Sequence, residues 1–156
     1  MKFRGKKRYF RELEIRGSGD QYNLDFSNDG WFDLWHTHLD FFGVGNIRPK
    51  FRKQHVNAHL ALYNNLIKEL DTLEKPYQSW IEFDEKDASL DAVYIHTPNP
   101  NEDNFPLEIT DFTLDSSIPD YLSDLINPEE FNVGYYKGSS DGSYIVQYKN
   151  KGILFK

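Results

Sequence analysis

Apolar and polar residues alternate in several short segments of the chain, and this period of two predicts β-strands. The clearest case is residues 21–27, in which every second side chain is apolar. The same criterion predicts a first strand at residues 8–16, with Leu13 and Ile15 on one face. Further strands are expected at residues 31–42, 77–84, 91–97, 105–114, 132–137, 143–149 and 153–155.

One long segment has the period of a helix instead. From about residue 50 to 75, apolar or imidazole side chains recur at three- and four-residue spacing, and Pro76 ends the pattern. A short second helix is predicted at about residues 118–126. Because hairpins dominate and only one helix is long, we expect an α+β fold, in which a mainly antiparallel sheet is packed by that helix. Residues 1–156 are expected to form a single domain.

The composition narrows the class of protein. The chain has 156 residues, no cysteine and 16% aromatic residues. The lack of cysteine excludes disulfides and cysteine-ligated zinc, whereas the aromatic content argues against intrinsic disorder. No segment approaches the roughly 18 apolar residues of a membrane span, and the start at Met1 lacks the apolar run of a secretory signal. We therefore expect a cytoplasmic protein with no membrane association.

Charge is distributed unevenly along the chain. The net charge is -7, yet residues 1–16 hold seven bases and two acids, while residues 82–130 hold fourteen acids and one base. Such asymmetry can steer a charged partner, or it can simply keep the surface solvated. The basic N-terminal segment is interleaved with rings that suit phosphates and bases. Because the whole chain is acidic, we expect no nucleic-acid partner.

The histidines raise the question of a metal site. In the predicted strand at 31–42, His36, His38 and Asp40 share a face, and His96 lies near the end of another predicted strand. A His-x-His pair joined by a carboxylate or a third imidazole is a common ligand set for zinc or another divalent ion. The metal motif of metallo-β-lactamase-like hydrolases has a second histidine directly after the aspartate, where this chain has Phe41. The alternative is that these residues belong to an aromatic wall.

Other catalytic patterns are absent from the sequence. His55 and His59 lie four residues apart on the predicted long helix, where we expect hydrogen-bonded residues at the edge of the core. There is no cysteine nucleophile, no Gly-x-Ser-x-Gly turn and no phosphate-binding loop. We therefore favour a binding protein without a cofactor over an enzyme.

The acidic segment supplies the candidate binding surface. Exposed rings would anchor a basic protein partner, and carboxylates would accelerate its association. The residues that we predict to contact the partner are Trp80, Asp84, Glu85, Tyr94, Glu102, Asp103 and Phe105, with Tyr121 as a further exposed ring.

Two aromatic segments that also hold histidines stand out: Trp31-Phe32-Asp33-Leu34-Trp35-His36-Thr37-His38 and Tyr94-Ile95-His96-Thr97-Pro98-Asn99-Pro100. With these segments, and as a compact, cysteine-free, acidic α+β chain rich in aromatic residues, the whole chain resembles in general character the bacterial immunity proteins that neutralise partner toxins. The resemblance implies a stoichiometric inhibitor of a basic toxin, and it assigns no residue a role. The alternatives are a metal-dependent hydrolase centred on the histidines, with zinc or another divalent ion, and a structural protein without separable activity.

Overall fold

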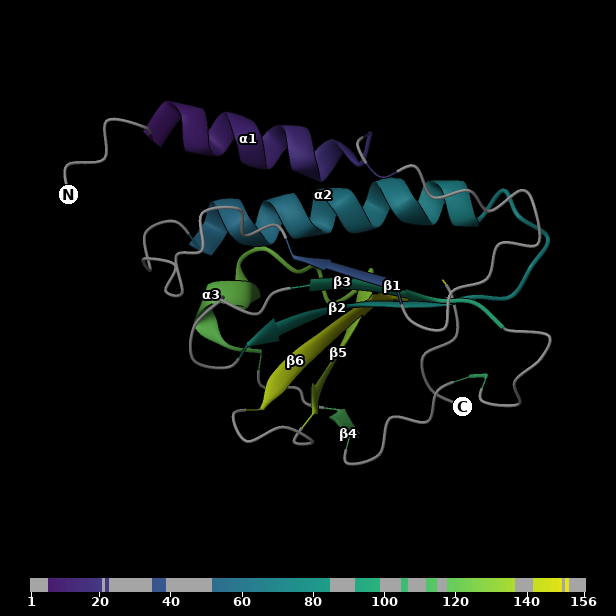
Figure 1. Cartoon of the computed structure of the whole chain (residues 1–156). Helices are drawn as coiled ribbons and strands as arrows, with labels where there is room; N and C mark the ends of the chain where they lie inside the picture. Colours follow the sequence, from purple (N-terminus) through teal and green to yellow (C-terminus); the bar gives the residue numbers. More distant parts are fainter. Residues whose placement is uncertain are drawn as a thin grey trace.

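The computed structural model describes residues 6–20, 22, 35–38, 52–84, 92–98, 105–106, 112–114, 118–136, 142–149 and 151. Figure 1 shows two long helices on the same side of a twisted sheet, with a short helix at one end. The helices are α1 (Lys6–Ser18), α2 (Arg52–Leu70) and α3 (Asp120–Ser123). The strands are β1 (Trp35–His38), β2 (Gln78–Asp84), β3 (Ala92–His96), β4 (Phe112–Leu114), β5 (Phe131–Tyr136) and β6 (Ser143–Tyr148).

The strands form one six-stranded sheet in the order β1-β3-β2-β6-β5-β4, and each pairing is antiparallel. Strand β2 lies inside the sheet, where Ile81 pairs with Val93 of β3 and with Val146 of β6. Strands β5 and β6 pair along their full lengths, as the predicted hairpin requires. The predicted fold class, an antiparallel sheet packed by one long helix, is confirmed.

Helix α2 forms the core with one face of the sheet. Its fully buried side chains include Val56, Leu62 and Leu70, and they pack in one cluster with strand residues such as Ile81 and Val93. Burying each of these side chains stabilises the fold by about 1.5–3 kcal/mol. The three- and four-residue spacing seen in the sequence is therefore the spacing of the core-facing side of α2.

A buried hydroxyl fixes the position of α2 over the sheet. The Tyr63 hydroxyl lies 3.3 Å from the Ser79 carbonyl of β2, to which it donates, and it accepts a hydrogen bond from the Tyr148 amide of β6 at 3.3 Å. The Tyr63 ring also stacks on Tyr148, with ring centroids 5.1 Å apart. One side chain thus connects the helix to two neighbouring strands.

The prediction of a strand at residues 8–16 is wrong, because these residues belong to α1. The alternation of Leu13 with Ile15 suggested a strand, yet Leu13 is 2% exposed and Ile15 is 48% exposed. The residues that face the core are Tyr9, Phe10, Leu13 and Gly17, which follow a helical period.

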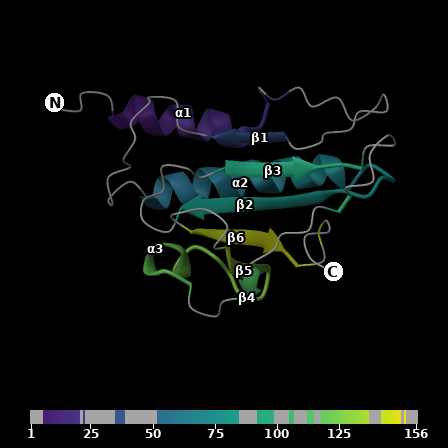
Figure 2. The same cartoon turned by 60° about the horizontal axis from the view of Figure 1, so that its bottom comes forward.

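Helices α1 and α2 pack side by side and run in the same direction (Figures 1 and 2). Near the start of both helices, the rings of Tyr9 and His55 lie 5.4 Å apart. Near the end of α1, the side-chain amide of Asn65 donates to the carbonyls of Gly17 and Ser18 at 3.1 and 3.0 Å. A Cβ at Gly17 would lie 3.1 Å from the backbone oxygen of Ala58, so glycine permits this close approach.

The remaining boundaries differ in detail from the predictions. Helix α2 ends at Leu70. Residues 71–75, which were predicted to continue the helix, form a turn and a bend instead, with backbone hydrogen bonds to the carbonyls of the last residues of α2. Of the predicted helix at 118–126, only Asp120–Ser123 is helical. The strand predicted at 105–114 is observed at Phe112–Leu114, and that at 31–42 at Trp35–His38. The strands predicted at 21–27 and 153–155 lie outside the described residues, except for Tyr22, which is not in a strand.

Candidate functional site

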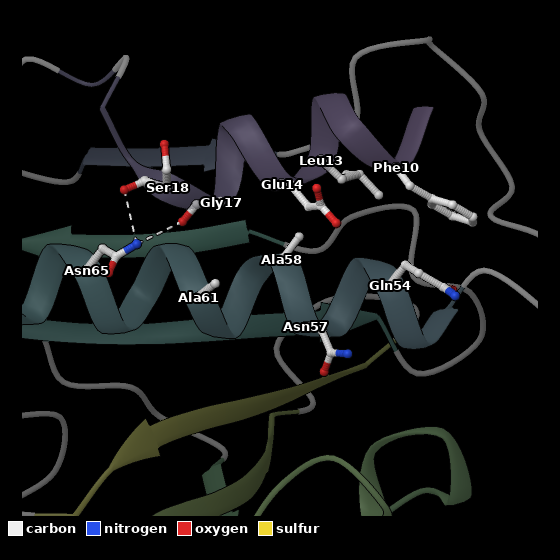
Figure 3. A pocket seen from close by; sticks show the side chains of 10 residues that line it. All are labelled: Phe10, Leu13, Glu14, Gly17, Ser18, Gln54, Asn57, Ala58, Ala61 and Asn65. Carbon is white, nitrogen blue, oxygen red and sulfur yellow. Dashed lines mark hydrogen bonds between the residues drawn. The ribbon is translucent and has the colours of Figure 1, made fainter. Parts of the chain in front are cut away.

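A solvent-exposed groove of about 340 Å³ lies between α1 and α2 (Figure 3). Each helix contributes one stripe of side chains at three- and four-residue spacing. The lining residues are Phe10, Leu13, Glu14, Gly17 and Ser18 of α1, and Gln54, Asn57, Ala58, Ala61 and Asn65 of α2. The groove therefore follows from the parallel packing of the two helices.

Small and apolar residues form the floor of the groove. Leu13, Gly17 and Ala58 are buried, and the ring of Phe10 is half-buried at the end where both helices begin. Ala61 is exposed, and its Cβ would lie 3.6 Å from a Cβ at Gly17. Because these side chains are short, the two helices leave a depression that another apolar surface can fill.

Gln54 and Glu14 differ from the other groove residues in the state of their side-chain oxygens. The side-chain oxygen of Gln54 is buried and has no hydrogen-bond partner among the described residues. The exposed carboxylate of Glu14 lies over the space between the helices (Figure 3). A buried polar atom without a partner costs free energy.

Exposed basic residues lie beside the groove-lining stripes. Lys7 and Arg11 precede Ser18 on α1 by about three and two turns, and Lys53 precedes Gln54 on α2, whereas Lys68 lines a separate depression with Glu129 and Glu130. Together the two helices carry eight basic and three acidic residues, a net charge of +5. Since the whole chain carries -7, the remaining residues carry -12. The helical layer and the rest of the protein thus have opposite charge.

The two histidines of α2 are both buried, at 1% exposure each. His59 donates from Nδ1 to the backbone oxygen of His55 at 2.7 Å, which agrees with the expected hydrogen-bonded role. Neither ring nitrogen of His55 has a hydrogen-bond partner in the described part of the chain, so the expectation is wrong for that residue. Burial, together with the nearby charge of His59, lowers the pKa of His55 to about 4.

Part of the predicted partner surface is buried. Trp80 is 5% exposed and Asp84 is 7% exposed, so the expectation of an exposed Trp80 ring is wrong. Trp80 stacks on Tyr94 at 5.0 Å and packs with Ile145, away from the α2 core cluster. Burial, with a smaller effect of the Glu82 charge, raises the pKa of Tyr94 to about 12.

The other predicted partner residues are described only in part. Tyr94, Phe105 and Tyr121 are half-buried rather than exposed. The Tyr121 hydroxyl donates to the backbone oxygen of Asp84 at 2.7 Å, and Phe105 stacks on His96 at 5.2 Å. Glu85, Glu102 and Asp103 lie outside the described residues.

Four exposed carboxylates of the acidic segment follow β4 in the sequence. Asp120 lies in α3, Asp124 lies directly after it, and Glu129 and Glu130 lie in the turn before β5; residues 120–130 contain no basic residue. Buried Leu122 and Ile126 anchor this stretch in the core. We name the exposed residues Asp120, Asp124, Glu129 and Glu130, which are grouped by their place in the sequence, the acidic patch; Glu129 and Glu130 line a depression together with Lys68, Lys149 and Lys151.

The residues of the predicted metal site are only partly described. His96 is fully buried, at 0% exposure. The β1–β3 register pairs His36 with Tyr94 and His38 with Ala92. The side chains of His36 and His38, and all of Asp40, lie outside the described residues. Among the residues that are described, no group of three or more potential ligands could hold a metal ion.

Comparison with known proteins gives no relative from which a function can be transferred. No family model, curated protein or solved structure matches the chain. In the described ranges, no helix is long and apolar enough to cross a membrane. The functional argument therefore depends on the geometry and charge of the chain itself.

Sequence reasoning missed the groove because it assigned residues 8–16 to a strand. A helical reading of Phe10, Leu13 and Gly17 would have placed them on one stripe. The small residues Ala58 and Ala61 on the predicted long helix were the matching signal, since they permit a close helix neighbour.

Proposed function

We propose that this chain is a small acidic cytoplasmic binding protein that contacts a basic protein partner through segment 82–130. In this role it acts as a stoichiometric inhibitor of a basic toxin, as the immunity proteins that it resembles do. The observation that carries the proposal is the acidic patch, whose four carboxylates are exposed within residues 120–130. Because they are hydrated in the free protein, they can attract a basic surface at little desolvation cost.

The attachment of α3 supports this role, because a binding surface gains from being rigid before its partner arrives. Leu122 is fully buried, and the Tyr121 hydroxyl bonds to the backbone of β2. The guanidinium of Arg52 lies 5.2 Å from the centre of the Tyr121 ring and adds a contact to α2. The carboxylates are thus presented from a segment that is anchored to both the helix and the sheet.

The experiment uses the immobilised full chain as bait, and the partner is the basic protein that it retains. Titration calorimetry should give a 1:1 complex whose affinity falls as salt rises, because salt screens exposed charges. Asp120→Asn combined with Asp124→Asn should slow association by about tenfold, since steering depends on these charges.

The matched control is Glu69→Gln combined with Glu74→Gln, which removes the same charge from exposed positions outside the acidic segment. This control should change association by less than about twofold. Equal effects of the two double variants, or retention of no basic protein by the full chain, would contradict the proposal.

A metal-dependent hydrolase is the second candidate, with His36, His38, Asp40 and His96 as ligands of zinc or another divalent ion. The β1–β3 register favours it: because His36 pairs with Tyr94, His96 is the diagonal neighbour of His36 on the adjacent strand. Tag-free protein should then contain one equivalent of metal, which His36→Ala and His38→Ala each abolish. Metal-free protein whose variants keep the wild-type circular dichroism spectrum would reject this candidate.

A further inference from the structure

We infer that the groove between α1 and α2 is a docking site for an acidic amphipathic helix of a partner protein. This inference is independent of the acidic patch, which contains no residue of the groove. The floor of Leu13, Gly17 and Ala58 is apolar and shallow, and a third helix can pack a ridge of small or aliphatic side chains into it.

The length of the groove suits a helix of three to four turns. Its α2 stripe extends from Gln54 to Asn65, which spans about 16 Å at 1.5 Å per residue. A volume of about 340 Å³ is enough for several side chains of such a ridge, while the partner backbone stays above the rims.

Charge complementarity selects an acidic partner. By the helix period, Lys7 and Arg11 lie beside the groove-lining stripe of α1, and Lys53 lies beside that of α2; all three are exposed. Since α1 and α2 run in the same direction, the positive ends of both helix dipoles also lie at the end of the groove near Phe10 and Gln54. Carboxylates of a docked helix would meet these cations at the end of the groove where both helices begin.

Glu14 favours a peptide over a nucleic acid. A phosphate backbone carries negative charge along its whole length, and Glu14 would repel it. A peptide helix instead confines its carboxylates to its flanks, so its apolar ridge can lie beside Glu14.

The test is a nuclear magnetic resonance titration of the full chain with defined probes. The first probe is a 15-residue peptide with a leucine and alanine ridge flanked by glutamates. The others are a scrambled peptide of the same composition, a version with lysines in place of the glutamates, and a single-stranded oligonucleotide. We expect saturable shifts of the Gln54, Asn57 and Asn65 side-chain amides with the first probe alone.

Variants separate groove binding from a general charge effect. Arg11→Glu combined with Lys53→Glu should weaken the acidic peptide about tenfold, because each reversal replaces an attraction with a repulsion. Ala61→Trp should abolish the shifts by filling the groove from an exposed position. The matched control is Arg8→Glu combined with Lys75→Glu, since both residues are exposed and neither lines the groove.

Three results would overturn the inference. The first is an equal loss of affinity in the groove variant and its charge-matched control. The second is unchanged binding in Ala61→Trp. The third is the absence of saturable shifts with the acidic peptide, or tighter binding of the oligonucleotide at the same signals.

Discussion

At the scale of single residues, His55 is the least well satisfied side chain of the core. It is 1% exposed, it contacts the ring of Tyr9, and its ring nitrogens lack hydrogen-bond partners among the described residues. The sequence could predict that His55 faces the core, because its spacing matches the helix period. It could not predict the missing partners, which depend on the tertiary packing of α1 against α2.

The buried His55 ring should make stability depend on pH. Its pKa is about 4 in the folded chain and about 6.5 when unfolded, so the unfolded state takes up a proton first as the pH falls. Stability should therefore be complete above pH 6.5 and decrease between pH 6.5 and 4. The loss between pH 7.5 and pH 5 should be about 2 kcal/mol. Urea unfolding at both pH values measures it.

The control for this prediction is His55→Phe, which keeps a ring against Tyr9 and removes the titration. The difference in stability between pH 7.5 and pH 5 should shrink by about 2 kcal/mol in this variant. An unchanged difference would show that other groups cause the acid sensitivity.

At the scale of elements, the strands and the long helix were predictable and α1 was not. Strands β2, β3, β5 and β6 have alternating or continuous apolar residues between clear turn signals, so local sequence determines them. In α1 the nine residues 8–16 fit the period of a strand and that of a helix equally well. Leu13 and Ile15 are separated by one polar residue, as in a strand, whereas Tyr9, Phe10 and Leu13 lie on one side of a helix. Contact with α2 decides between the two, and that contact is not visible in a local pattern.

The attachment of α1 to α2 should depend on Asn65. Its side-chain amide satisfies the carbonyls of Gly17 and Ser18, which have no partner within the helix. Asn65→Ala should lower the free energy of unfolding by about 1–2 kcal/mol and speed hydrogen exchange in α1 more than in the sheet. Asn57→Ala, an exposed change on the same helix, should cost less than about 0.5 kcal/mol. Equal exchange rates in the two variants would contradict this role.

At the scale of the whole molecule, charge is separated between the two long helices and the rest of the chain. The sequence shows a basic N-terminal segment and an acidic segment at 82–130, but only the fold joins the bases of α1 and α2 into one layer of net charge +5. It also shows that Trp80 and Asp84 are buried, because strand β2 lies inside the sheet, whereas Asp120 and Asp124 are exposed on α3. Sequence alone located the acidic segment, but it could not show that Asp84 is buried while Asp120 and Asp124 are exposed.

Hydrogen–deuterium exchange of the full chain, with and without the basic protein that it retains, tests the proposed function most directly. We predict slower exchange in residues 118–131, which hold the acidic patch, and this protection should weaken as salt is raised. Complex formation with no protection in segment 82–130, or protection that is insensitive to salt, would contradict a binding surface made of exposed carboxylates.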